Sequence, residues 1–258
     1  NTGNGTFSWN SATNNVIGGN LVALNFLNTT TNLILRNITT LSSNANGPFF
    51  GNSSTITNCN FAGNFSLVAD SSSINTINNS TFAGNDNLIQ AGNFDIQNSR
   101  FGKTGTGTTI LKAAHNVAGN VLIREGNNKF LNNVQFETYA VLPGGATLQQ
   151  TFHGQDTCLG NMSFIMKGNS AMTSNSNGNS YVAGNVIIDG QGARKWVEFN
   201  GVNSATFNVA GNFTAKNFTP NPEPGIVNTN VYLRSITAAG TDTCGTFYCT
   251  TGDIQNSS

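Results

Sequence analysis

The sequence predicts an all-β fold, a parallel β-helix (β-solenoid) in which one short motif repeats along the chain. Three observations lead to this prediction. A hydrophobic motif recurs at nearly constant spacing, a Gly-Asn dipeptide recurs after it, and the composition is rich in the turn residues Asn, Ser, Thr and Gly. Apolar residues at the i, i+3, i+4 spacing of an amphipathic helix are hard to find, so we expect very little helix.

The repeated motif is Ile-x-Asn-x-x-Phe. It occurs at residues 56–61, 77–82 and 96–101, so that its Phe residues lie 21 and 19 residues apart. With Leu in place of Ile, the motif recurs at 131–136 and 159–164. Self-similarity at a fixed period indicates a solenoid, in which each repeat is one coil.

Each recurring residue of the motif has a physical role in such a coil. A short strand alternates inward and outward side chains, so the Ile and the Phe point into the core. Asn tolerates the left-handed backbone of a bend, and stacked Asn side chains can bond to one another. We therefore expect a structural ladder of Asn and a column of Phe, formed by Asn58, Asn79, Asn98, Asn133 and Asn161 and by Phe61, Phe82, Phe101, Phe136 and Phe164.

A second recurring element supports the coil prediction. Gly-Asn follows the motif at Gly63-Asn64 and Gly84-Asn85 and returns at Gly184-Asn185 and Gly211-Asn212, usually before a short alternating strand. Glycine suits a tight corner, where a Cβ atom would collide with the neighbouring coil.

Residues 56–64 (Ile-Thr-Asn-Cys-Asn-Phe-Ala-Gly-Asn) and 77–85 (Ile-Asn-Asn-Ser-Thr-Phe-Ala-Gly-Asn) resemble the parallel β-helix repeat of pectate-lyase-like proteins. The resemblance covers residues 56–136 and, more loosely, 159–218. It implies right-handed coils of roughly 20 to 30 residues, with short strands on three sides of each coil. The other interpretation is an antiparallel sandwich or barrel, which would show hairpin turns and no fixed self-similarity.

The charge content limits the classes of partner. Charged residues make up 9% of the chain and the formal net charge is +0, whereas soluble domains carry about 25% charged residues. We expect no nucleic-acid partner, because no Lys/Arg cluster supplies the basic footprint that nucleic acid requires. No apolar run approaches the ~20 residues of a membrane span.

The cysteines and the chain ends predict the domain organisation. Cys244 and Cys249 are close enough in sequence for a disulfide, although two free thiols remain the other interpretation. Cys59 and Cys158 belong to motifs several coils apart, so we expect no bond between them. We expect a parallel β-helix over 1–235 and an irregular coil with the Cys244–Cys249 disulfide over 236–258. The sequence of 95–99 recurs at 253–257, so the chain is expected to end inside a repeat, as a segment of a longer protein or next to another subunit.

We expect no catalytic, cofactor or metal site. Glycosidases need paired carboxylates, and the acids here are sparse, with no two adjacent. Two segments combine residue types that could act together in chemistry. His153 lies close to Asp156, which we interpret as a loop hydrogen bond because no nucleophile accompanies the pair. Residues 189–198 hold Asp189, Arg194, Lys195, Trp196 and Glu198, which we interpret as an outward strand face, although an exposed Trp beside Arg could also stack on a sugar ring.

The functional hypothesis is an extracellular, cell-surface structural or adhesive solenoid segment, part of a filament or of a longer surface protein. Its expected partners are other copies stacked end to end, further coils of a longer chain, or surface glycans. The composition resembles that of large secreted bacterial adhesins, including those of gliding Bacteroidota. The alternative is a carbohydrate-active domain (polysaccharide lyase or hydrolase) or a phage tailspike β-helix.

Overall fold

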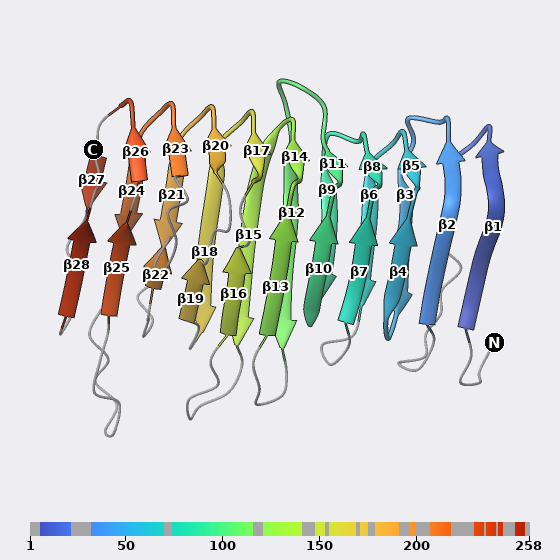
Figure 1. Cartoon of the computed structure of the whole chain (residues 1–258). Helices are drawn as coiled ribbons and strands as arrows, with labels where there is room; N and C mark the ends of the chain where they lie inside the picture. Colours follow the sequence, from blue (N-terminus) through green and yellow to red (C-terminus); the bar gives the residue numbers. More distant parts are fainter. Residues whose placement is uncertain are drawn as a thin grey trace.

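Short parallel strands, stacked side by side along one axis, make up the regular structure of the chain (Figure 1). The computed structural model describes residues 6–21, 32–69, 74–115, 121–140, 148–152, 155–168, 171–174, 179–190, 197–199, 207–217, 230–234, 236–240, 242–244 and 251–255. Within these ranges the regular elements are all β-strands, and their pairings are parallel. The predicted all-β parallel β-solenoid is confirmed.

The strands form three faces, which we call face 1, face 2 and face 3. Face 1 consists of β1 (Thr6–Ile17), β2 (Asn32–Thr40), β4 (Ser54–Thr57), β7 (Ile74–Asn78), β10 (Asn93–Gln97), β13 (Val121–Gly126), β16 (Leu148–Phe152), β19 (Ala171–Ser174), β22 (Val197–Phe199), β25 (Asn230–Arg234) and β28 (Thr251–Gln255). Face 2 consists of β5 (Asn60–Phe61), β8 (Thr81–Phe82), β11 (Arg100–Phe101), β14 (Lys129–Phe130), β17 (Thr157–Cys158), β20 (Ser180–Val182), β23 (Phe207–Val209) and β26 (Ile236–Ala238).

Face 3 is a separate sheet of nine strands. They are β3 (Asn46–Gly51), β6 (Phe65–Ala69), β9 (Asn87–Ala91), β12 (Thr108–His115), β15 (Asn133–Ala140), β18 (Met162–Gly168), β21 (Val186–Asp189), β24 (Phe213–Lys216) and β27 (Asp242–Cys244). A coil visits the three faces in turn, as β4, β5 and β6 do. Equivalent residues of successive coils are 19 apart at Ser80 and Ser99 and 29 apart at Ser99 and Asn128.

Apolar side chains fill the interior because each strand alternates between buried and partly exposed positions. On face 1, Ile56, Ile77 and Ile96 are in register and fully buried. On face 2, the rings of Phe61, Phe82 and Phe101 stack, with centroids 5.5 and 4.9 Å apart and planes 22° and 4° apart. These separations are close to the ~4.8 Å spacing of neighbouring strands, so each ring lies over the one before it.

Asparagine occupies the corner between face 1 and face 2 in coil after coil. Asn58, Asn79 and Asn98 have φ of 54°, 49° and 52°, the left-handed conformation that Asn tolerates. Asn79 Nδ2 donates to Asn58 Oδ1 at 2.8 Å, whereas Asn98 Nδ2 donates to Asn78 Oδ1 at 3.3 Å. The corner continues to Asn127, which has φ of 56° and donates from Nδ2 to Asn98 Oδ1 at 2.8 Å.

Asn133 and Phe136 do not continue this corner and column, which corrects the predicted alignment. Phe130 pairs with Phe101 and stacks on it at 5.3 Å, so Asn127 and Phe130 hold the expected positions. The physical reason is the longer coil, which includes the exposed turn 103–106 and places residues 131–136 past the next corner. Phe136 lies on face 3 and stacks on Phe164 at 5.0 Å.

Asn133 and Asn161 belong instead to a second Asn ladder, at the corner between face 2 and face 3. The backbone N–H of Asn161 donates to Asn133 Oδ1 at 2.9 Å. Asn185 N–H donates to Asn161 Oδ1, and Asn212 N–H to Asn185 Oδ1, both at 2.8 Å. The recurring Gly-Asn dipeptide therefore marks this second corner, where the Asn side chain replaces a missing backbone acceptor.

Parallel pairing continues past residue 235, where the sequence predicted an irregular coil. Strand β26 pairs with β23, β27 with β24 and β28 with β25. The strands of 236–255 thus extend all three faces. Cys244 is on β27. Cys249 lies outside the described residues, so the expected Cys244–Cys249 disulfide stays a prediction.

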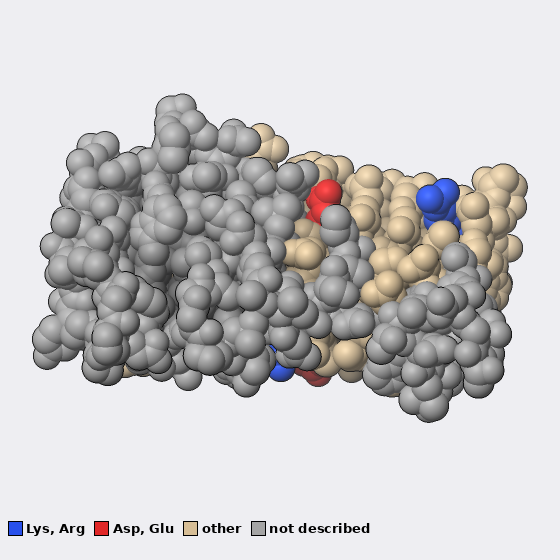
Figure 2. All heavy atoms as spheres, turned by 90° about the horizontal axis from the view of Figure 1, so that it is seen from below, with Lys and Arg blue, Asp and Glu red and all other residues tan. Residues whose placement is uncertain are grey.

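Charged side chains are sparse on the described surface. Figure 2 shows isolated Lys/Arg and Asp/Glu side chains scattered among uncharged ones, with no cluster of either sign on the described part of that face. No helix in the described residues is both long and apolar enough to span a membrane.

Candidate functional site

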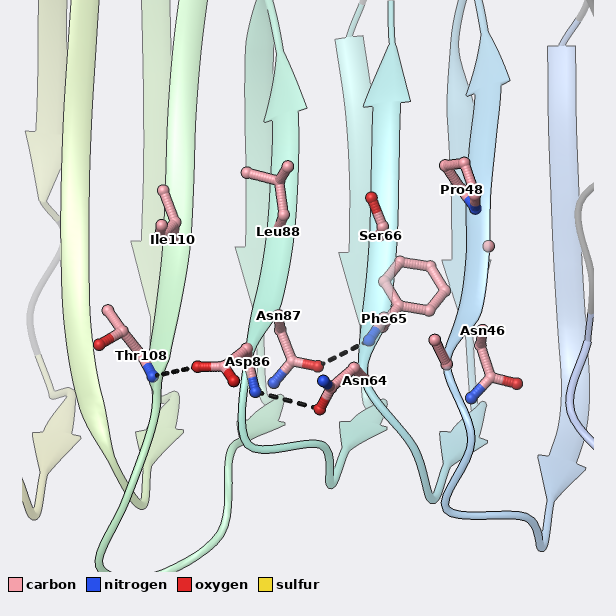
Figure 3. Close-up of a pocket in the computed structure, with 12 residues that line it drawn as sticks. Asn46, Pro48, Asn64, Phe65, Ser66, Asp86, Asn87, Leu88, Thr108 and Ile110 are labelled. Atoms are coloured by element: carbon pink, nitrogen blue, oxygen red, sulfur yellow. Dashed lines mark hydrogen bonds between the residues drawn. The ribbon is translucent and has the colours of Figure 1, made fainter.

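A groove on the outer side of face 3 is the candidate binding site. It encloses about 260 Å³ over strands β3, β6, β9 and β12. Its lining residues are Ala45, Asn46, Gly47, Pro48, Asn64, Phe65, Ser66, Asp86, Asn87, Leu88, Thr108 and Ile110 (Figure 3). The groove follows from strand alternation, because the neighbours Leu67, Ile89 and Leu111 point into the core and leave Ser66, Leu88 and Ile110 facing outward.

The groove has an apolar floor and a polar rim. Leu88 and Ile110 lie side by side on neighbouring strands, with Pro48 two strands away (Figure 3). Ser66, a small residue, lies between Pro48 and Leu88 on the floor of the groove. An apolar floor with a few fixed polar groups is the usual make-up of a small-ligand site.

Backbone hydrogen bonds fix the polar rim. Asp86 Oδ1 accepts from the backbone N–H of Thr108 at 3.1 Å, and the backbone N–H of Asp86 donates to Asn64 Oδ1 at 3.1 Å (Figure 3). Asp86 is exposed. The rim therefore presents a carboxylate and an amide in a set orientation, suited to ligand hydroxyl groups. Asp86 is the acid among the lining residues, so the groove holds no carboxylate pair for general acid–base hydrolysis.

Further along the same outer face, two acids form ion pairs with lysines of neighbouring coils. Glu137 lies 3.6 Å from Lys112 Nζ, and Asp189 lies 3.7 Å from Lys216 Nζ. Asn217 also donates from Nδ2 to Asp189 Oδ1 at 2.9 Å. Within the described part of the chain, no group of three or more His, Cys, Asp or Glu residues could hold a metal ion.

The structure describes Asp156, Asp189 and Glu198 from the two charged segments that the sequence singled out. Asp156 is 1% exposed, so it cannot meet a polymeric substrate, and His153 lies outside the described residues. Asp189 ends β21 on face 3, whereas Glu198 is on β22 of face 1, in register with Tyr232. Arg194, Lys195 and Trp196 also lie outside the described residues.

Cys59 and Cys158 are free thiols buried in the core. Cys59 faces Ser80 of the next coil, whose Oγ accepts from the Cys59 backbone N–H at 3.1 Å. Cys158 takes the position of the Phe column one coil beyond Phe130. Burial raises the pKa of both thiols, and that of Cys158 to about 11.

We expect both thiols to be unreactive in the folded protein. With a pKa of about 11, the Cys158 thiolate population at pH 8 is lower by about two orders of magnitude than that of a free thiol. Alkylation of the native protein at pH 8, followed by proteolysis and mass spectrometry, should leave Cys59 and Cys158 unlabelled. The same reaction in denaturant is the control and should label both. A peptide linking Cys59 to Cys158 would contradict the register of the coils.

Comparison with known proteins identifies no relative: no protein-family model, no curated protein and no solved structure matches the chain. The fold and the outer groove are therefore the basis for any functional proposal.

Proposed function

We propose that this chain is a structural and adhesive segment of an extracellular surface protein. In this proposal the solenoid is a spacer, and the outer side of face 3 is the contact surface. The observation that carries the proposal is the use of the polar residues. Asn side chains at both corners bond to the neighbouring coil, and they stiffen the stack instead of surrounding a reaction centre. A rod with few charged side chains on its outer side suits a stalk that contacts ligands along its length.

The outer groove supports surface glycans as the contact partner. A sugar ring offers an apolar C–H face and a rim of hydroxyl groups. Leu88 and Ile110 on the floor would pack against the C–H face, and Asp86 and Asn64 on the rim would bind the hydroxyl groups. The proposal also includes end-to-end stacking of copies or of further coils, because the edge of a parallel sheet can accept another strand.

Glycan-array binding of the purified chain tests the adhesive proposal. We expect binding that Ile110→Asp abolishes, because a charge would be placed on the apolar floor. The matched control is Ile187→Asp, which alters a 36% exposed isoleucine of the same outer face outside the groove and should leave binding unchanged. Absence of binding to every glycan, or equal loss in both variants, would contradict the adhesive proposal.

One observation favours polysaccharide cleavage as a second candidate function. Glu137, Ile165 and Asp189 are in register on consecutive strands of the outer side of face 3. The backbones of the two acids are therefore about two strand spacings apart, ~9.6 Å, close to the ~6.5–9.5 Å that separates the carboxyl groups of inverting glycosidases. Release of oligosaccharides from a polysaccharide panel, lost in both Glu137→Gln and Asp189→Asn, would establish this function over simple adhesion.

A further inference from the structure

A column of mostly polar side chains runs through the interior of the solenoid, just before face 2. In successive coils it consists of Cys59, Ser80, Ser99, Asn128, Asp156 and Ser180, all buried. Strand register fixes their equivalence, because Lys129 pairs with Thr157 and Thr157 with Tyr181, each one residue after a column member. We call this set the polar column.

From Ser80 to Asp156, each side chain of the polar column accepts a hydrogen bond from the backbone of the coil before it. Ser80 Oγ accepts from Cys59 N–H at 3.1 Å, and Ser99 Oγ from Ser80 N–H at 3.2 Å. Asn128 Oδ1 accepts from Ser99 N–H at 3.0 Å. Asp156 Oδ1 accepts from Asn128 N–H at 2.5 Å. The column thus requires an acceptor atom at each coil and no charge.

The pattern breaks at Asp156 and Ser180. Asp156 Oδ2 and Ser180 Oγ are buried and have no hydrogen-bond partner, although the two residues belong to consecutive coils. Both residues are 1% exposed. The next position of the column is Phe207, which pairs with Ser180 and is apolar. A buried polar atom without a hydrogen-bond partner costs free energy, and for Asp156 Oδ2 that cost is larger when the carboxyl group is ionised.

The described surroundings supply no positive charge to offset an ionised Asp156. Among the side chains that the structure describes on β14, β17 and β20, Lys129 and Tyr181 are exposed on the outer side, and Cys158 is a buried thiol. On β13 of the adjoining coil the charged residues are Arg124, in register with Asp95, and Glu125, in register with Ile96 and Phe152. A carboxylate buried without a cation is strongly disfavoured relative to the neutral acid.

We propose that Asp156 is a proton-binding site of the solenoid: in the folded chain its carboxyl group is neutral, because its Oδ2 atom is buried without a hydrogen-bond partner. The proton comes from solvent and is bound without any other bond being broken. Proton uptake therefore stabilises the coils on either side of Asp156, and deprotonation weakens them.

The direction of the linkage follows from burial. Desolvation raises the pKa of Asp156 to about 7, against the opposing effect of the hydrogen bonds from Asn128. Between the unfolded and folded pKa values the folded chain holds one proton more than the unfolded chain. The contribution of Asp156 protonation to the free energy of unfolding is therefore complete below about pH 4. It decreases as the pH rises to about 7.

Urea unfolding of the full chain and of Asp156→Asn, from pH 5 to pH 8, tests the proposal. The wild-type unfolding constant should rise by up to about tenfold per pH unit below pH 7 because of this one group. Asp156→Asn should lack that component, because an amide does not titrate in this range and its oxygen keeps the acceptor for the backbone N–H of Asn128. The variant should consequently be more stable than wild type at pH 8 and not at pH 5. The matched control is Asp86→Asn, an exposed acid whose replacement should leave the pH slope unchanged.

Two outcomes would overturn the proposal. One is an Asp156→Asn variant that is less stable than wild type at pH 8, as expected if an ionised Asp156 binds a metal cation. The other is a pH slope that persists in Asp156→Asn and disappears in Glu125→Gln, which would assign the proton to Glu125. A readout on the folded wild type is the infrared carbonyl band of a protonated carboxyl group, which should be present at pH 5 and absent from Asp156→Asn.

Discussion

Replacing Phe82 by alanine is expected to destabilise the solenoid by about 3–5 kcal/mol. The ring of Phe82 is fully buried and contacts three other rings, with centroids 5.5 Å from Phe61, 4.7 Å from Phe65 and 4.9 Å from Phe101. Truncation removes this burial and leaves a cavity between two stacked rings, which the strands on either side cannot close. Urea unfolding followed by circular dichroism would measure the change in free energy of unfolding.

Two further variants make the Phe82 result specific. Phe82→Leu keeps most of the apolar volume and should cost less than Phe82→Ala. Thr81→Ala changes the neighbouring residue of β8, which is partly exposed, and should stay within about 0.5 kcal/mol of wild type. A loss for Phe82→Ala no larger than that for Thr81→Ala would contradict a closely stacked column.

The three clearest motif copies were enough to predict the coil register from sequence. In each of them Ile, Asn and Phe fall at fixed offsets, and the structure aligns Ile56 with Ile77 and Phe61 with Phe82. The prediction failed in the next coil because Glu125 stands where the motif has Ile. The remaining signal was Asn127-x-x-Phe130, which keeps the spacing of Asn and Phe. Both corners of a coil favour Asn. The residues around Asn133 therefore resemble the motif, although they lie at the corner between face 2 and face 3 and not at the corner between face 1 and face 2.

The outer groove and the polar column were not predictable in the same way. The groove depends on which outward side chains of β6, β9 and β12 happen to be small or large, and those positions follow no repeat. Asp156 stands in a Gln-Asp-Thr sequence typical of a surface loop, and its burial results from the next coil, which contains Ser180 and packs against it. Desolvation is a property of the assembled stack, so no local pattern of residues carries it.

A methyl group added at Gly63 should destabilise the chain by about 3 kcal/mol or more, at or beyond the upper end of overpacking costs. Gly63 is buried at the corner between face 2 and face 3, and its added Cβ would overlap the backbone carbonyl oxygen of Asn44. It would also lie 2.6 Å from the carbonyl carbon of Asn44 and 2.8 Å from that of Ser43. Both neighbours are backbone atoms of the preceding coil, so relief requires one coil to move away from the other.

The comparison of Gly63→Ala with Gly18→Ala isolates this steric effect. A Cβ at Gly18 would meet nothing within 4 Å, so Gly18→Ala should leave stability unchanged within about 0.5 kcal/mol. Thermal unfolding and limited proteolysis of both variants would give the difference. Since displacement of one coil breaks the hydrogen bonds to the next, Gly63→Ala should also open the chain to protease near residues 44–64. Equal stability of the two variants would mean that consecutive coils do not approach each other at this corner, and the stacking of the coils would have to be revised.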